Sequence, residues 1–195
     1  MRKWLSKANR GIIILCAVLL FLSVYLVYDL VQSKKNEKVV LSISNQFITD
    51  CGKVLSSGEN LDVNSMDLSD YNYDLNAFTR YLVESEFSSI SDYYYPNDAI
   101  KDLQIEVFQN DYFRILDERG ALLLSCSQVP TQHVKDCSVY KDSASVTLSV
   151  NRVLELMDEN GKRFSESENC IYNIDFLYVD GEWKIISLDY YRSDY

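Results

Sequence analysis

Five cysteines and a single histidine are the side chains in this chain best suited to nucleophilic or metal chemistry. Zinc sites use Cys and His ligands spaced a few residues apart, commonly as a C-x-x-C pair. No such pair occurs, and His133 stands in the polar stretch PTQHVKD, where we expect an exposed loop. The sequence also holds no P-loop, G-x-G-x-x-G, G-x-S-x-G or H-E-x-x-H motif. We therefore predict no catalytic residue, no metal site and no cofactor.

Four of the cysteines lie in the acidic part of the chain, and this even number is compatible with disulfides if that part is outside the cell. The favoured pair is Cys126 with Cys137, because the segment between them has the pattern of two strand ends around a loop. A bridge closing a loop of that size contributes about 3 kcal/mol. The alternative is a set of buried free thiols that behave as small apolar side chains.

Arg152 is the charged residue with the most unusual position. In an alternating stretch it has the same parity as Val150 and Leu154, so its side chain points to the side that should be apolar. The functional interpretation is a ligand-binding pocket in which Arg152 meets an anion beside Tyr172. The alternatives are a β-bulge at this position or a side chain that extends to the sheet edge.

The tyrosines are clustered along the chain. One group comprises Tyr93, Tyr94 and Tyr95, and another comprises Tyr190 and Tyr191. Tyr is enriched at interfaces because it combines a rigid apolar ring with a polar tip. We therefore predict an interaction surface at these residues, with ordinary core and strand positions as the alternative.

An apolar run near the N-terminus determines where these side chains stand in the cell. No charged residue occurs between Arg10 and Asp29, and 18–21 residues of helix span about 27–31 Å, the thickness of a bilayer's hydrocarbon core. A cleaved signal peptide has a shorter apolar core and a small-residue cleavage site. Here the run is longer and no such site follows it, although cleavage and lipidation at Cys16 remain alternatives. We predict a transmembrane helix over residues 11–31 that binds the lipid bilayer.

Charge predicts the orientation. Residues 1–10 carry four basic residues and no acid, whereas the lysines that follow the span are accompanied by Glu37. The positive-inside tendency then places a tail, residues 1–10, in the cytoplasm, and residues 32–195 outside the membrane. Residues 32–195 carry 15 Lys and Arg against 28 Asp and Glu, which argues against a nucleic-acid partner.

The external part begins with helical periodicity. Apolar residues three and four apart predict an amphipathic helix over 34–57, which extends almost directly from the span. A second helix is predicted over about 74–91, after a polar, irregular stretch at 59–73. Pro96 ends any helical structure at that point.

From about residue 101 the apolar period changes to two, which predicts strands. The expected strands are residues 103–107, 111–116, 122–128, 143–157, 164–179 and 182–191, and those at 111–116 and 122–128 meet near DERG. Asn160-Gly161 and Asp180-Gly181 are typical hairpin turns, so the last three strands should form an antiparallel meander. Apolar residues of both parities in these strands predict that the second sheet face is also partly covered, by another element or by a partner subunit. The fold class is α+β, with two helices packed on a curved, cone-like antiparallel sheet of four to six strands.

The closing hairpin YVDGEWKIISLDYY, together with two helices ahead of long strands, resembles the nuclear transport factor 2-like (cystatin-like) fold. That resemblance implies a cone-shaped α+β domain, and enzymes of this fold use an acid or a His–Asp pair inside the cone. We transfer no catalytic residue from it. The layout of tail, span and external domain is similar to that of bitopic scaffold subunits of type IV secretion and conjugation machines.

These observations favour a non-enzymatic membrane-anchored envelope protein whose external domain binds another protein or forms a homo-oligomer, as an accessory of a secretion- or conjugation-type complex. The alternative is an envelope domain that binds a small ligand or a glycan in the cone pocket. Enzymatic activity of an isomerase-like or hydrolytic kind would need a buried acid that faces such a pocket.

Overall fold

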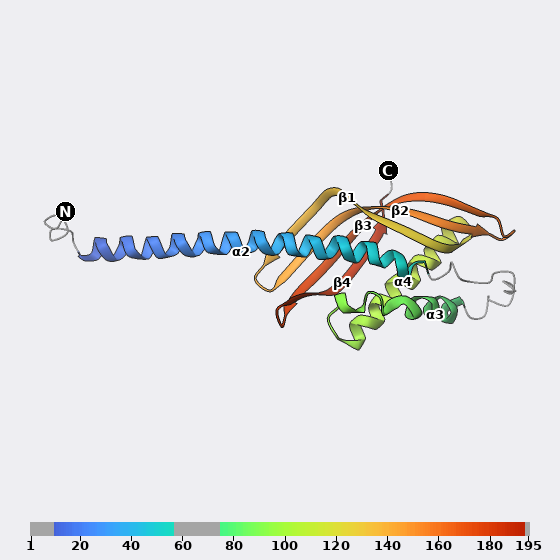
Figure 1. Cartoon of the computed structure of the whole chain (residues 1–195), viewed down its shortest axis with the longest axis horizontal. Helices are drawn as coiled ribbons and strands as arrows, with labels where there is room; N and C mark the ends of the chain where they lie inside the picture. The colour runs from blue at the N-terminus through green and yellow to red at the C-terminus, as the bar shows by residue number, and fades with distance from the viewer. Residues whose placement is uncertain (1–9, 57–74, 194–195) are drawn as a thin grey trace.

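The computed structural model of the chain describes residues 10–56 and 75–193. Its first element is α2, Arg10–Val54, a single helix of 45 residues (Figure 1). The predicted span and the predicted helix over 34–57 are therefore parts of one helix. Residues 1–9 of the predicted tail and the polar stretch at 59–73 lie outside the described residues.

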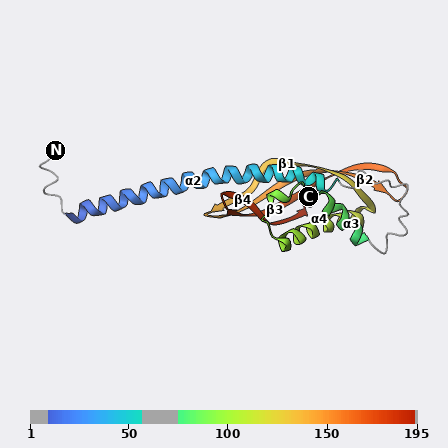
Figure 2. The ribbon, with the colours of Figure 1, turned by 60° about the horizontal axis from the view of Figure 1, so that its bottom comes forward.

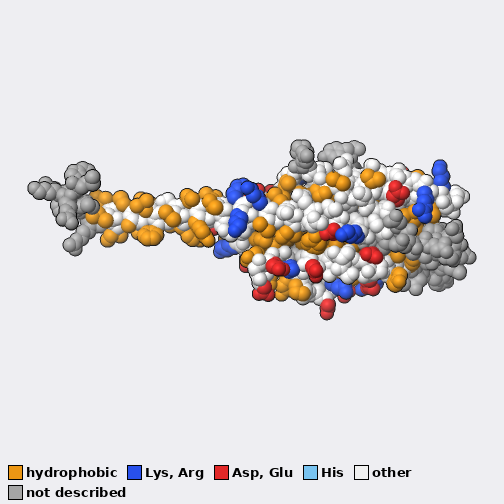
Figure 3. All heavy atoms as spheres, in the orientation of Figure 1, with side chains coloured by type: hydrophobic (Ala, Val, Ile, Leu, Met, Phe, Trp, Pro, Cys, Tyr) orange, Lys and Arg blue, Asp and Glu red, His pale blue; other side chains and the backbone are white. Residues whose placement is uncertain are grey.

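The N-terminal part of α2 projects from the rest of the molecule as a bare apolar shaft (Figures 1 and 3). Every residue from 11 to 32 is exposed. By length and composition α2 is able to cross a membrane. Its apolar side chains make no core with the described chain, so lipid is the environment that suits them.

Three further helical segments follow within residues 75–193. They are α3, Leu75–Phe87, the 3-10 turn η4, Ser91–Tyr93, and α4, Asp98–Arg119. The helix predicted over 74–91 is confirmed as α3, which ends a few residues earlier. Asn97, directly after Pro96, caps α4 by accepting hydrogen bonds from the amides of Ala99 and Ile100.

The two strands predicted over 103–107 and 111–116 are wrong, because both segments belong to α4. The alternation of Leu103, Ile105 and Val107 is accidental, since Leu103 is 59% exposed while Ile105 is buried. The residues that do face inward are spaced three and four apart and include polar ones: Gln104, Ile105, Phe108, Gln109, Asp111, Tyr112 and Ile115. The predicted turn at DERG is instead the end of this helix, where Gly120 adopts a left-handed φ of 59°.

Four antiparallel strands form one sheet in the order β1-β2-β3-β4. They are β1, Ala121–Tyr140, β2, Ser143–Asp158, β3, Arg163–Val179, and β4, Glu182–Arg192. The predicted C-terminal meander is confirmed, with its turns at 158–162 and at Asp180-Gly181. The loop predicted around His133 is wrong, because the backbone there belongs to strand β1. The pairing of β1 with β2 shifts in register on both sides of Val134.

The helices line one side of the sheet, and the core lies between the two layers (Figures 1 and 2). Along β2, the even-numbered side chains from Ala144 to Leu156 are buried and the odd-numbered ones are not. Buried residues of α2, α3 and α4 join them in a single apolar cluster. The predicted α+β class, with helices against an antiparallel sheet, is confirmed, and the sheet has four strands.

Candidate functional site

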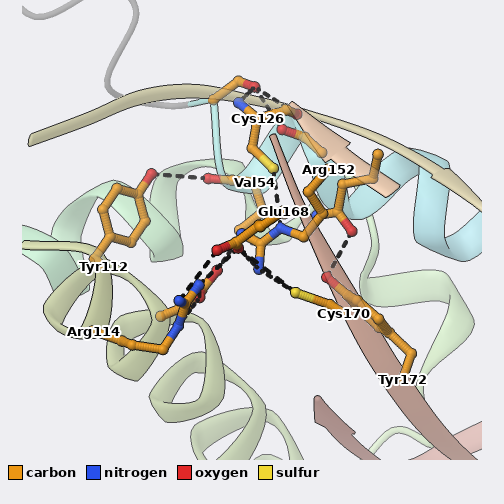
Figure 4. Close-up of polar contacts among 12 residues, drawn as sticks. Val54, Tyr112, Arg114, Cys126, Arg152, Glu168, Cys170 and Tyr172 are labelled. Atoms are coloured by element: carbon orange, nitrogen blue, oxygen red, sulfur yellow. Dashed lines mark hydrogen bonds and ion pairs between the residues drawn. The ribbon is translucent and has the colours of Figure 1, made fainter. Parts of the chain in front are cut away.

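Arg152 lies on the inner face of β2 and is completely buried. Its guanidinium Nη2 donates to Asp111 Oδ2 of α4, and its Nη1 lies 3.3 Å from Glu168 Oε1 of β3 (Figure 4). Glu168 comes to this place because it is the direct cross-strand neighbour of Arg152. The parity of Arg152 therefore predicted its direction correctly.

Arg114 completes a cluster of four charges with Arg152, Asp111 and Glu168, which we call the ion quartet. Its Nη2 lies 2.8 Å from Asp111 Oδ1 and 2.8 Å from Glu168 Oε1. Arg114 is the only one of the four with substantial exposure, at 23% of its side chain, whereas the two acids are each 2% exposed. Two cations and two anions balance, so the cluster as a whole carries no net charge into the core.

The quartet controls the ionisation of its members. Burial by itself raises the pKa of the Asp111 carboxyl, but the charges of Arg152 and Arg114 outweigh burial and hold that pKa below its ordinary value. The same pairing raises the pKa of Arg152 against the opposing effect of burial. The pairing therefore favours the charged forms of Asp111 and Arg152 in the interior of the domain.

Two thiols border the quartet. Cys126 Sγ lies 3.4 Å from Arg152 Nε, and Cys170 Sγ lies 3.6 Å from Arg152 Nη1. Burial raises the pKa of both thiols, that of Cys170 to about 11. Both are therefore protonated at neutral pH and are poor nucleophiles.

The predicted bridge between Cys126 and Cys137 is wrong. Both cysteines are free and belong to the same strand, β1, where Cys137 follows Cys126 by eleven positions. At about 3.3 Å per residue their Cα atoms stand tens of ångströms apart, whereas a disulfide needs about 5.5 Å. The polar residues between them looked like a loop in the sequence, but the structure accommodates them as register shifts within the strand.

Aromatic rings close the site on its other side. Tyr172 and Tyr190 stack with centroids 4.5 Å apart, and the Arg152 guanidinium lies 5.5 Å from the centre of the Tyr190 ring. The Tyr172 hydroxyl donates to Gln128 Oε1 at 2.7 Å. The sequence predicted that Arg152 and Tyr172 belong together, and both line the interior of the domain. Neither has exposed surface, so in this conformation their polar groups serve the protein itself.

The predicted tyrosine surface is not assembled in one place. Tyr94 is 5% exposed and stacks on Phe87, and Tyr190 is packed in the core as described above. The Tyr93 hydroxyl donates to Asp50 Oδ2 of α2 at 2.7 Å. For Tyr94 and Tyr190 the interaction hypothesis is therefore wrong, because their rings are needed inside the domain. Tyr191 is 54% exposed, and it stands on the opposite side of the sheet.

That opposite side, the outer face, has an unusual composition. Several of its side chains are exposed, among them Val129 at 60% and Val153 at 44%, so no described helix covers them. Ile171 is buried there, beside its cross-strand partners Ser149 and Tyr191, as are Met157 and Leu124 toward one end of the face. We define the centre of the outer face as Val129, Thr147, Ser149, Asn151, Val153, Ser167, Asn169, Ile171, Asn173 and Tyr191.

The ten residues of this centre are uncharged, and Asp136 and Asp189, the cross-strand partners of Thr147 and Asn173, border it. Thr147 and Asn173 hydrogen-bond to each other across the strands at 3.0 Å. Beside this centre, a hollow of about 400 Å³ opens between β1, β2 and β3 and is lined by Leu124, Ser125, Ser127, Val153, Glu155 and Arg163. No described helix covers this side, and cover by a partner subunit, the other possibility from the sequence, stays a prediction. The outer face presents small polar groups and scattered apolar side chains to its surroundings.

No protein-family model and no curated protein match the chain. Among solved structures, the chain is similar to a periplasmic fragment of TraM, at 11% identity and a TM-score of 0.40, over 82% of this chain and 98% of that one. It is also similar to a putative dehydratase of the NTF2-like family from Streptomyces avermitilis, at 13% identity and a TM-score of 0.38, over 69% of this chain and all of that one. The intermembrane space region of the chloroplast protein ARC6 matches at 13% identity and a TM-score of 0.30, over 53% and 85%. Similarities at this level give no information about chemistry or partners.

Proposed function

We propose that the chain is a single-pass membrane protein with a cytoplasmic N-terminal tail and an external domain over residues 32–195. Three features support this. The apolar segment at 11–31 is exposed along its whole length, it is long enough to span a hydrocarbon core, and it lies between a basic tail and an acidic domain. An apolar shaft of this length exposed to water would be strongly unfavourable, and a bilayer removes that cost.

The external domain, in this proposal, acts through protein–protein contact. The observation that carries the proposal is the uncharged centre of the outer face. The central part of protein interfaces is depleted in charged residues, because a charge that loses its hydration without a partner is costly. The exposed side chains of Val129, Val153 and Tyr191 add apolar and aromatic surface to this centre, and Tyr is enriched at interfaces.

The layout of tail, span and external α+β domain is similar to that of bitopic scaffold subunits, and we propose an accessory role in an assembly of the secretion or conjugation type. A chain held in a membrane meets its neighbours at high effective concentration, so an interface of modest affinity suffices there. Ligand binding in the cone pocket, the alternative from the sequence, has less support because the ion quartet and the stacked tyrosines use the interior groups that a ligand would need.

The test is a charge placed in the centre of the outer face. Asn151 is exposed on β2, and Asn110 is exposed on α4, so Asn151→Arg and Asn110→Arg are the same change on the two sides of the domain. The full chain in native membranes is crosslinked, solubilised and sized by light scattering. We expect wild type and Asn110→Arg to give the same crosslinked assembly, with a second copy or another protein, and Asn151→Arg to lose it. A wild-type chain that is strictly monomeric and recovers no partner contradicts the proposal.

A further inference from the structure

The external domain begins almost at the point where the apolar segment of α2 ends. Residues 11–32 are all exposed, and the first partly covered positions of the helix are Ser33, Asn36 and Glu37, followed by the fully buried Val40. Spacings of three and four mark one stripe of the helix that packs against the domain. Only residue 32 lies between the apolar segment and this stripe, a rise of about 3 Å in all.

β1 is the strand that covers this stripe. It runs antiparallel to α2, with Cys126 N bonded to Ser56 Oγ near the helix's C-terminal end. Eleven residues further along β1, Cys137 comes close to the other end of the stripe. Burial raises the pKa of its thiol, and the charges of Glu37 and Lys34 also act on it. β1 therefore follows α2 toward the shaft.

The strand does not stop at Cys137. Three more residues bring it to Tyr140, about 10 Å further on, and 10 Å corresponds to six or seven residues of helix. The β1–β2 hairpin tip, Tyr140-Lys141-Asp142, therefore lies at the end of the domain that faces the shaft, near the level at which the domain begins on α2. The ribbon views agree, since this hairpin points toward the shaft (Figures 1 and 2).

The side chains at this level suit a lipid headgroup layer, which is about 5–7 Å thick on each side of the hydrocarbon core. Tyr140 is 71% exposed, and the Lys141 ammonium lies 5.3 Å from the centre of its ring. Lys34, Lys35 and Lys38 lie where the shaft meets the domain, where blue side chains gather in Figure 3. Tyrosine rings and snorkelling lysines are the groups that favour such an interface.

We propose that the β1–β2 hairpin tip is a second membrane contact, in which Tyr140 lies among the headgroups and Lys141 meets lipid phosphate on the same side of the bilayer as Lys35 and Lys38. This inference rests on the proposed anchor. Its consequence is orientation, because a domain that touches the bilayer at both α2 and the hairpin cannot turn freely about the axis of α2. The outer face is then presented in a fixed direction along the membrane.

The experiment places a fluorophore at the hairpin tip of the full chain. Tyr140→Trp is reconstituted in vesicles of phosphatidylcholine and phosphatidylglycerol, some of which carry a nitroxide on the lipid headgroup. The control is Tyr81→Trp, since Tyr81 is 69% exposed on α3, away from the shaft. Wild type already contains Trp4 and Trp183, so its fluorescence is subtracted from that of each variant. The remaining emission, which comes from the added tryptophan, is compared in vesicles with and without nitroxide.

We expect the headgroup nitroxide to remove most of the emission added by Tyr140→Trp and little of that added by Tyr81→Trp. Extraction of the same vesicles with alkaline carbonate separates the two proposals. A chain that carbonate strips from the vesicles overturns the anchor, and this inference with it. A chain that resists carbonate while both added tryptophans are quenched equally leaves the anchor standing and overturns the hairpin contact alone.

Discussion

At the scale of single residues, the ion quartet is the feature that most constrains the domain. Asp111 and Arg114 come from α4, Arg152 from β2 and Glu168 from β3, so four side chains connect the helical layer to the two central strands. Such a cluster adds little stability compared with apolar side chains of the same volume, but it is very intolerant of losing one member. It therefore fixes how α4 lies on the sheet.

Asp111→Asn tests this connection. Removing one charge leaves Arg152 buried with a single full anionic partner, so we expect the free energy of unfolding at pH 7 to fall by about 3 kcal/mol. Asp117→Asn, the same change at an exposed position of α4, should have almost no effect. Denaturant titrations of the folded domain in the full chain measure both.

The stability that the charged Asp111 contributes should depend on pH in a direction that its lowered pKa determines. The pKa of Asp111 is lower in the folded than in the unfolded protein, so its contribution is fully present above the ordinary carboxyl pKa of about 4 and is lost as the pH falls through the folded value. The stability difference between wild type and Asp111→Asn should therefore shrink as the solution is acidified below about pH 4. A difference that stays constant with pH contradicts the assignment of Asp111 as a charged member.

The sequence predicted part of this site. Parity pointed Arg152 toward the apolar side of the sheet, and the ligand-binding hypothesis placed Tyr172 in the same interior. Its acidic partners were not recognised for two different reasons. Glu168 has the parity of the inner face but no apolar neighbour at 166, and Asp111 stands in a segment whose local alternation favoured a strand. A cross-layer contact of this kind has no local signal in the sequence.

At the scale of elements, close packing of α2 against β1 is the second constraint. Gly52 lies in α2 where the helix meets the strand, and a Cβ atom built there would stand 2.8 Å from the backbone oxygen of Cys126. The neighbouring Ser56 hydroxyl accepts from the Cys126 amide at 3.0 Å, which holds the two elements at this distance. Only a residue without a side chain allows this approach.

Gly52→Ala should destabilise the protein, whereas a glycine-to-alanine change within a helix usually stabilises it. In an exposed helix interior, alanine is more stable than glycine by about 1 kcal/mol. Here the clash is with backbone on a neighbouring element, so we expect the variant to be less stable than wild type. Asn45→Ala on the exposed side of the same helix should instead be neutral or slightly stabilising, and the midpoints of denaturant unfolding compare the two. Stabilisation by Gly52→Ala would mean that α2 and β1 are further apart than described.

Element types were predictable where the apolar period was long and the turn chemistry strong. The hairpins at Asn160-Gly161 and Asp180-Gly181 are examples, since Gly161, Asp180 and Gly181 all have positive φ. The prediction was wrong for α4 because its inward stripe is interrupted by Gln104, Gln109 and Asp111, which conceal a period of 3.6. The length of β1 was predicted too short, because register shifts within the strand interrupt the alternation of its inward and outward side chains.

At the scale of the whole molecule, the sequence predicted that the transmembrane helix ends at residue 31, but the backbone remains helical beyond that residue. α2 continues without a break from Arg10 to Val54, so the proposed anchor and the first helix of the domain form one rod of about 66 Å. The composition changes at residue 31, but nothing in the helix ends there. A rod of this kind transmits the orientation of the span to the domain directly, which a flexible linker would not.

The central claim is that this rod crosses a membrane and holds the domain outside it. The most direct measurement is protease treatment of intact spheroplasts from a bacterial host that expresses the full chain, with detection of a C-terminal tag and of a cytoplasmic marker protein. The account predicts that the tagged domain is digested from outside while the marker survives, and that undigested chain remains in the membrane pellet after alkaline carbonate. A domain that is protected until the cells are lysed, or a soluble chain that lacks its first thirty residues, would contradict it.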